Sequence, residues 1–371
     1  MRALITTDTV GGVWTFTQEL AGQLLSRGWS IHLVSLGRVP SEAQQRWFEQ
    51  TAREWSGQFS WAALDVPLEW MEENHRAWDE AAPALVRMAQ EFGAELLHSN
   101  QLCFGALPVN IPRIVTAHSD VLSWAGACRS TPLEDSPWLR RYLELVRRGL
   151  SQAHAIVAPT DWMANSLLDD FPLPRRPLVI PNGRTVAAAD ASPRKLQAIT
   201  AGRLWDEAKN VAMLGQVRSP IPLLVAGDAD AGPGIRNASM SGVTFLGPLA
   251  SEELLRIFRE SDMYLCTSRY EPFGLAPLEA ALCGCAVLTN DIPSLREVWH
   301  DGALYFQDAD GLTSLLNQLS HAPDELSAAQ QRSLERARIF SGSRMATGYE
   351  HLFRHWIKHA EGTRLCPAVS A

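Results

Sequence analysis

No apolar run in this chain of 371 residues approaches the length of about 20 residues that a membrane-spanning helix needs. The N-terminus reaches Thr6 and Asp8 too early for the apolar core of a secretory signal peptide. The six cysteines form no C-x-x-C pair and no zinc-like spacing, and most of them lie among apolar residues. We therefore expect a cytoplasmic protein whose thiols are buried and inert.

The chain also has no net positive charge. The formal net charge of −8 argues against a nucleic-acid-binding protein, because such proteins usually have a basic surface. Lysine occurs only as Lys195, Lys209 and Lys358. With 46% hydrophobic and 20% charged residues, the composition excludes a disordered chain, a collagen-like repeat and a small disulfide-rich protein. The length predicts about two to three domains.

Short apolar runs alternate with amphipathic stretches, which is the pattern of βαβ units around parallel sheets. Helices are predicted at residues 13–26 and 335–360. Strands of the first half are predicted at residues 3–6, 30–35, 96–99, 113–117 and 155–158. Strands of the second half are predicted at residues 197–201, 222–226, 243–246, 263–266 and 286–289.

The alternation breaks at residues 181–184, and residues 186–193 are small and polar, as in a linker. Two consecutive doubly wound α/β domains fit this pattern better than one large sheet. We place the N-terminal Rossmann-like domain at residues 1–185 and the second domain at residues 186–340. Ligands of such folds bind outside the carboxyl ends of the strands, so we expect the ligand between the two domains.

Two segments place phosphate-binding groups directly after predicted strands. Gly11 and Gly12 precede a helix, where backbone N–H groups can approach a phosphate. A tight βα turn explains them equally well, and the absence of a full G-x-G-x-x-G or Walker A pattern weakens a nicotinamide or NTPase interpretation. Arg203, followed by Lys209 six residues later, suits a diphosphate. A solvated surface pair is the alternative interpretation.

The most informative segment spans residues 268–280. Glu271 is predicted in a loop and Glu279 in the first turns of a helix at residues 276–283. Gly274 and its neighbours can present backbone N–H groups to an anion at the start of this helix. Two carboxylates eight residues apart can accept hydrogen bonds from several hydroxyls of one ligand. Alternatively, Glu279 pairs locally and Glu271 is solvated.

The segment from Glu271 to Glu279 resembles the E-x7-E motif of retaining glycosyltransferases of family 4, which have the GT-B fold. Other landmarks of that family are matched in the same order along the chain. They are residues 11–12, 115–118, 180–183, 202–204 with Lys209, 226–228, 245–247 and 291–298. The resemblance thus spans nearly the whole chain and is most specific between residues 201 and 302.

The resemblance implies roles for four charged residues. Glu279 matches the glutamate that holds the ribose hydroxyls of the nucleotide. Glu271 matches the glutamate that contacts hydroxyls of the donor sugar. Arg203 and Lys209 match the cationic pair that neutralises the departing diphosphate.

Backbone groups complete the implied donor site. Phe273, Gly274 and Leu275 match positions whose N–H groups approach the sugar or the diphosphate. Gly12, with Gly11 beside it, matches the glycine that lets the first loop approach the phosphates.

His118 matches the active-site histidine of the family, which contacts the donor sugar. A single histidine after a strand is usually structural, so this role comes from the resemblance. The family commonly has an acidic residue directly after this histidine, whereas here Ser119 intervenes before Asp120. Trp14 and Trp124 are weaker candidates for stacking on an acceptor sugar, since most tryptophans pack in cores.

The resemblance implies a metal-independent hexosyltransferase that moves a sugar from a nucleoside-diphosphate sugar to an acceptor hydroxyl with retained configuration. Retention in this family is explained by front-side attack. UDP-sugars are the commonest donors, and GDP- and ADP-sugars are also possible. A C-terminal helix at about residues 341–371 is expected to pack back on the first domain.

Other interpretations remain open. A glycosyl phosphorylase or a nucleotide-sugar epimerase can share the architecture, and so can a non-catalytic protein that binds a nucleotide sugar. The segment from Arg140 to Arg148 alternates arginines with apolar residues and could contact an anionic membrane or a phosphorylated acceptor. A solvated amphipathic helix is the simpler interpretation of that segment. The acceptor and the oligomeric state are not predicted.

Overall fold

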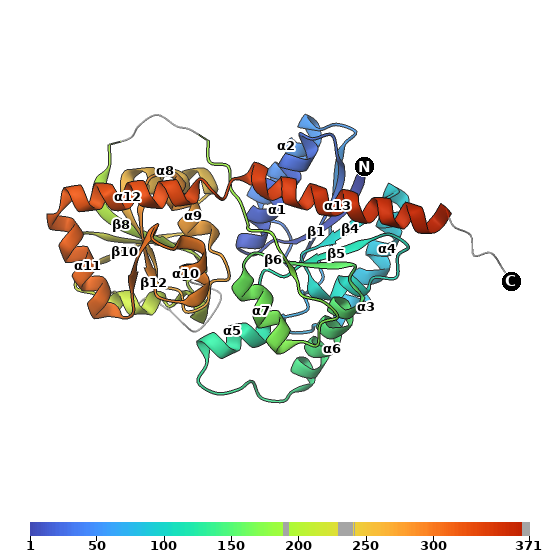
Figure 1. Cartoon of the computed structure of the whole chain (residues 1–371), viewed down its shortest axis with the longest axis horizontal. Coiled ribbons are helices and arrows are strands. Elements are labelled where there is room, and N and C mark those ends of the chain that lie inside the picture. Colours follow the sequence, from blue (N-terminus) through green and yellow to red (C-terminus); the bar gives the residue numbers. More distant parts are fainter. Residues whose placement is uncertain (188–192, 229–239, 241, 366–371) are drawn as a thin grey trace. The chain divides into compact units, whose positions relative to one another are not determined.

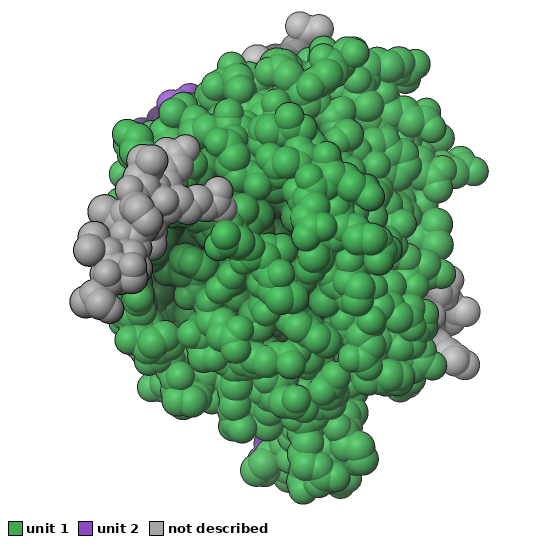
Figure 2. All heavy atoms as spheres, turned by 90° about the vertical axis from the view of Figure 1, so that its right-hand side faces the viewer, with its two compact units in different colours: residues 1–123, 131–181, 342–371 green, residues 124–130, 182–341 purple. Residues whose placement is uncertain are grey.

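The structure is a computed structural model that describes residues 1–187, 193–228, 240 and 242–365. The predicted linker at residues 186–193 therefore lies mostly outside the described residues, as does Cys366. The chain forms two compact units (Figure 1), and the surface visible in Figure 2 belongs almost entirely to the first, in green. The first comprises residues 1–123, 131–181 and 342–371, and the second comprises residues 124–130 and 182–341.

The described part of the first unit contains a seven-stranded parallel sheet in the order β3-β2-β1-β4-β5-β6-β7. The strands are β1 (Arg2–Asp8), β2 (Ser30–Leu36), β3 (Phe59–Ala63), β4 (Leu96–Ser99), β5 (Arg113–Thr116), β6 (Ala155–Ala158) and β7 (Leu178–Val179). The strand order reverses between β1 and β4, and this is where open α/β sheets bind ligands at their carboxyl edge. The five predicted strands are present, and β3 and β7 were not predicted.

Helices cover both faces of this sheet (Figure 1). They are α1 (Gly12–Leu25), α2 (Glu42–Glu54), α3 (His75–Asp79), α4 (Ala81–Phe92), α6 (Pro137–Gln152), α7 (Asp161–Asp170) and α13 (Gly342–Leu365), with the 3-10 turn η1 (Leu102–Ala106). Helix α5 (Val121–Cys128) begins in the first unit and belongs to the second unit from Trp124 onward. Helix α13 packs on α1, where Glu350 forms a 3.2 Å ion pair with Arg27. Nearby, the ring of Phe353 lies 5.8 Å from that of Trp29.

The described part of the second unit contains a six-stranded parallel sheet in the order β10-β9-β8-β11-β12-β13. Its strands are β8 (Lys195–Ala201), β9 (Leu223–Ala226), β10 (Val243–Gly247), β11 (Ser261–Cys266), β12 (Ala286–Asn290) and β13 (Ala303–Phe306). The order reverses between β8 and β11, so Arg203 and Glu271 follow the two strands that flank the reversal.

The helices of the second unit are α8 (Ser251–Glu260), α9 (Leu275–Leu282), α10 (Pro293–Trp299), α11 (Ala309–His321) and α12 (Pro323–Ala337), with the 3-10 turns η2 (Glu207–Lys209) and η3 (Val211–Gln216). The prediction of one continuous helix at residues 335–360 is therefore wrong, because two helices share this range. Helix α12 ends at Ala337, and α13 begins five residues later at Gly342. The chain passes from the second unit to the first at this break.

The cysteines are free thiols wherever the structure describes them. Cys103, Cys266, Cys283 and Cys285 are buried, whereas Cys128 is half-buried. Burial raises the pKa of the Cys285 thiol to about 12, so this thiol is protonated and unreactive at neutral pH.

Helix α6 and the turn η1 pack backbone against backbone. A Cβ atom on Gly149 would lie 2.0 Å from the carbonyl oxygen of Leu102. A Cβ atom on Gly105 would lie 2.2 Å from the carbonyl oxygen of Gly149. Both contacts are far inside van der Waals distance, so these two glycines allow α6 to approach η1 and the sheet behind it.

We expect Gly149→Ala to lower the free energy of unfolding by about 3 kcal/mol, because the new methyl group forces α6 away from η1. Urea unfolding followed by circular dichroism measures this loss. Gly22→Ala is the matched control, because a Cβ atom at this position in α1 meets nothing within 4 Å. The control should be stabilised by about 0.5 to 1 kcal/mol through helix propensity. Equal stabilities of the two variants would contradict the close packing.

Candidate functional site

The charged residues predicted for the donor side converge at the carboxyl edge of the second sheet. Arg203 follows β8, and Lys209 ends the turn η2 shortly after it. Glu271 lies in the loop that connects β11 to α9. Thr267, directly after β11, donates a 2.7 Å hydrogen bond to the backbone carbonyl of Lys209. The N–H of Arg269 donates a 2.8 Å bond to the carbonyl of Ala208, so the two loops are joined.

Lys209 and Glu271 form an ion pair. The Lys209 Nζ atom lies 2.5 Å from Glu271 Oε2, and the two side chains are 22% and 14% exposed. Ser268 Oγ also donates to Glu271 Oε2, at 3.3 Å. Such a partly buried, charge-assisted pair holds both side chains in one orientation. Sequence reasoning predicted both residues but not that they contact each other.

Arg203 is oriented by Asp206, which the sequence analysis did not predict. Its Nη2 atom donates a 2.6 Å bond to Asp206 Oδ2. Burial favours a higher pKa for Asp206, but the charge and hydrogen bond of Arg203 outweigh it and lower the pKa. Asp206 Oδ1 accepts a 3.2 Å bond from the Trp124 indole. Trp124 therefore contributes to a partly buried polar contact in the second unit.

Glu279 forms a buried ion pair with Arg184. The Arg184 Nε atom lies 2.6 Å from Glu279 Oε1, and the side chains are 15% and 12% exposed. The backbone N–H of Arg184 donates a 3.0 Å bond to the carbonyl of Phe340. Residues 180–183 were noted as a landmark, but Arg184 was not predicted as a site residue. Its separation of 95 residues from Glu279 gives no local signal for the contact.

Helix α9 presents an open N-terminus beside these residues. Its N-cap is Gly274, with a φ of +90° and no side-chain capping bond. A Cβ atom there would lie 2.8 Å from Pro277 Cγ, so only glycine fits. The Phe273 side chain is buried and packs edge-on against Phe340 at 5.3 Å. Phe273, Gly274 and Leu275 can thus offer backbone N–H groups, as helix N-termini do to anions.

The first unit has a comparable loop between β1 and α1. Gly11 is the N-cap of α1, with a φ of +74° and no side-chain capping bond, and both Gly11 and Gly12 are exposed. Trp14 in the first turn of α1 packs edge-on against Trp47 at 5.3 Å and Phe48 at 5.2 Å. These contacts make Trp14 part of an aromatic cluster with α2.

His118 follows β5 and is held by Asn100. Its Nε2 atom lies 2.8 Å from Asn100 Oδ1, and Asn100 Nδ2 donates a 2.6 Å bond to the carbonyl of Thr6. A carbonyl only accepts, so the amide of Asn100 is oriented and its oxygen faces the histidine. His118 therefore carries its hydrogen on Nε2 and a lone pair on Nδ1. Asp120 is a local cap, because its Oδ1 accepts bonds from Leu122 N and Ser123 N.

Burial lowers the pKa of His118 to about 3. The folded protein should then keep this ring neutral at about pH 5, where a histidine in the unfolded chain is protonated. The free energy of unfolding should consequently fall as the pH drops below about 6.5 toward 3. Histidine ring NMR, assigned with His118→Gln, measures the titration directly. A titration midpoint above about pH 5 would contradict a buried neutral imidazole.

The arginines of α6 are largely partnered. Arg140 pairs with Asp135 at 2.6 Å and Arg141 pairs with Glu144 at 3.1 Å. The Arg148 guanidinium lies 3.9 Å from the centre of the Trp78 ring. Among the helices described, none combines the length and apolarity needed to cross a bilayer.

Comparison with protein families gives two matches that follow one another along the chain. Residues 10–187 match the model of Glycosyltransferase Family 4, and residues 195–329 match that of Glycosyl transferases group 1. The α-maltose-1-phosphate synthase of Mycobacterium tuberculosis is 26% identical over 259 residues. The match covers 60% of this chain and 65% of that protein, so the chain spans slightly less than two thirds of this curated relative.

Solved structures share the architecture. Sucrose-phosphate synthase from Thermosynechococcus elongatus aligns with a TM-score of 0.74 and 19% identity, over 96% of this chain and 98% of that one. Anabaena HepE, solved in complex with UDP-glucose, aligns with a TM-score of 0.70 and 17% identity, over 96% and 100% of the two chains. The matches to both family models and to these folds show that the chain belongs to glycosyltransferase family 4 and has the GT-B fold.

Proposed function

We propose that the protein is a retaining, metal-independent glycosyltransferase that moves a sugar from a nucleoside-diphosphate sugar to an acceptor hydroxyl. The observation that carries this proposal is the grouping of Arg203, the Lys209–Glu271 pair and the open N-terminus of α9 at one sheet edge. We further propose that residues 186–340 hold the donor. Residues 1–185, with the C-terminal helix from about residue 341, would form the acceptor side.

The proposed reaction separates charge in a way that these residues can stabilise. As the bond between the anomeric carbon and the diphosphate breaks, negative charge grows on the leaving phosphate. Arg203, Lys209 and the α9 N–H groups would stabilise that charge by preorganised electrostatics. The acceptor oxygen attacks the anomeric carbon from the face on which the diphosphate leaves, and the acceptor's proton passes to the departing phosphate.

The glutamates then have binding and orienting roles. Glu271 would accept hydrogen bonds from donor-sugar hydroxyls while it holds Lys209 in place. Glu279 would accept the ribose hydroxyls, with Arg184 as its partner in the absence of a nucleotide. The lone pair on His118 Nδ1 would accept a hydrogen bond from a sugar hydroxyl, since its Nε2 hydrogen is bonded to Asn100.

We expect UDP to raise the melting temperature more than GDP or ADP, because at equal concentration the ligand that binds the folded state more tightly stabilises it more. HepE in complex with UDP-glucose supports UDP as the first choice. A thermal-shift series with the three nucleotides measures the preference. A matching donor sugar and a panel of acceptors then test for release of nucleoside diphosphate, with the anomeric configuration of the product read by NMR.

Two results would favour other functions. Tight nucleotide binding with no acceptor-dependent turnover would indicate a non-catalytic binding protein, and consumption of free phosphate would indicate a phosphorylase.

The α6 segment from Arg140 to Arg148 is a proposed peripheral contact with the inner face of a membrane. Sedimentation with anionic vesicles, compared with neutral vesicles, tests that contact.

A further inference from the structure

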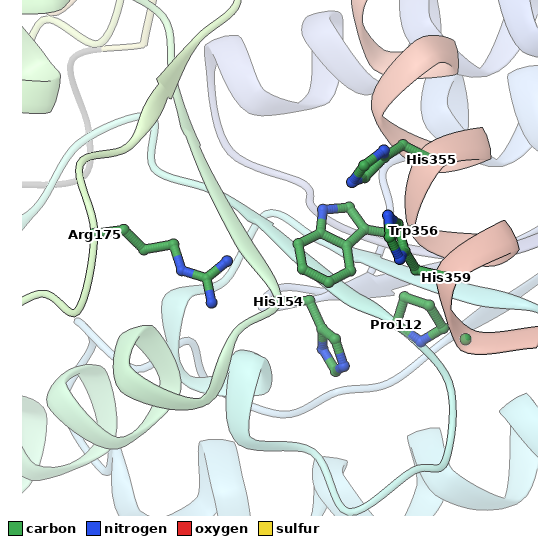
Figure 3. A pocket seen from close by; sticks show the side chains of 7 residues that line it. Pro112, His154, Arg175, His355, Trp356 and His359 are labelled. Atoms are coloured by element: carbon green, nitrogen blue, oxygen red, sulfur yellow. The ribbon is translucent and has the colours of Figure 1, made fainter. Parts of the chain in front are cut away.

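The first unit has a pocket that contains none of the predicted site residues. Its volume is about 420 Å³, within the size range of small-molecule sites. Figure 3 shows its lining, with Arg175 on one side and side chains of α13 on the other. The lining residues are Pro112, His154, Arg175, His355, Trp356, His359 and Ala360.

This pocket lies at the opposite edge of the sheet from His118. Pro112 directly precedes β5 and His154 directly precedes β6, whereas His118 follows the end of β5. Because the strands are parallel, residues before them and residues after them lie at opposite edges. A strand of this length spans about 13 Å. The pocket is therefore separate from the edge that carries Gly12 and His118.

The polar lining residues can bind an anion. The backbone N–H of Arg113 donates a 3.2 Å bond to His154 Nδ1, so the hydrogen of the neutral ring is on Nε2 and can be donated to a ligand. Burial lowers the pKa of His154, as do the charges of Arg113 and Arg175, so the ring is a neutral donor at pH 7. Arg175 supplies a positive charge, and none of the lining residues that the structure describes is acidic.

Trp356 supplies a flat apolar surface in the middle of this polar lining. In Figure 3 the guanidinium of Arg175 is directed toward its indole ring. The Trp356 ring packs edge-on against His154 at 5.3 Å and His355 at 5.6 Å, which fixes its orientation. Aromatic rings of this kind stack on the apolar face of a sugar, while neighbouring imidazoles bond its hydroxyls.

We infer that this pocket is a second ligand site, which binds a sugar phosphate. The phosphate is bound by Arg175 and the His154 Nε2–H group, and the sugar ring lies against Trp356. This site is additional to the proposed donor and acceptor sites. Since its lining comes from α13 and from the loops that enter β5, β6 and β7, a bound ligand links the C-terminal helix to the sheet.

Isothermal titration of the full chain with glucose 6-phosphate tests the site, with glucose and inorganic phosphate as separate probes. Glucose 6-phosphate should bind at least about tenfold more tightly than either fragment. Arg175→Gln should weaken its binding about tenfold, the usual cost of losing a charge-assisted hydrogen bond to phosphate. Trp356→Leu should weaken glucose 6-phosphate binding but not inorganic phosphate binding.

Arg176→Gln is the matched control. Arg176 is the next residue in the same exposed loop, but it pairs with Asp161 at 2.7 Å and does not line the pocket. This variant should bind glucose 6-phosphate as the unaltered protein does, and both arginine variants should keep their affinity for UDP. Undiminished glucose 6-phosphate binding in Arg175→Gln, or equal affinity for inorganic phosphate, would overturn the assignment. These readouts are independent of glycosyl transfer.

Discussion

Replacing Lys209 with alanine should lower kcat by a factor of about 10² to 10³, because in the proposed reaction the departing diphosphate would lose a preorganised positive charge. The effect on KM should be smaller, since this charge is needed most when the phosphate leaves. Steady-state kinetics with the donor identified by thermal shift measure both constants. The loss is specific to the reaction only if the variant still folds, so its melting temperature belongs to the same experiment.

Lys195→Ala provides the control for Lys209→Ala. It removes the same charge from the same unit, but Lys195 is 63% exposed and its partner Glu260 lies at the surface of α8. An exposed pair of this kind contributes little to stability. Turnover should remain unchanged in this variant. An equal loss in both lysine variants would mean that general electrostatics, and not the position of Lys209, governs the rate.

The strands were largely predictable because parallel strands are apolar on both faces and read as short continuous runs. The strands that were not predicted are β3, β7 and β13. Strand β3 lies at the sheet edge and pairs only with β2, so its burial pattern is mixed. Strand β7 has only two residues. Strand β13 is another edge strand, with half-buried residues in its middle.

The sequence predicts which candidate site residues lie at the same edge of a sheet, but it does not predict which side chains pair with one another. Residues after the ends of parallel strands must meet at one edge, which is why Arg203 and Glu271 could be grouped from the sequence. The ion-pair partners of the two glutamates could not be predicted from the strand pattern. Lys209 and Glu271 are 62 residues apart, and the side chain that pairs with Glu279 lies before β8. Such pairs depend on loop paths that local periodicity does not encode.

Glu279→Ala should weaken UDP binding about hundredfold, because the proposed bonds from two ribose hydroxyls to this carboxylate would be charge-assisted. The same change removes the carboxylate oxygen that lies 2.6 Å from Arg184 Nε. Breaking a buried pair on one side costs about 3 to 5 kcal/mol, so the variant should also be clearly less stable. Titration calorimetry and urea unfolding measure these two losses separately.

Two further variants separate nucleotide recognition from stability. Replacing the pair by Arg184→Met and Glu279→Leu should restore most of the stability, because an apolar pair of similar volume often equals a buried ion pair. UDP binding should stay about hundredfold weaker in that double variant. Arg184→Met alone keeps the carboxylate and should bind UDP within about threefold of the unaltered protein. If this single variant lost UDP binding as fully as Glu279→Ala does, Arg184 itself would be a nucleotide-binding residue and Glu279 only its support.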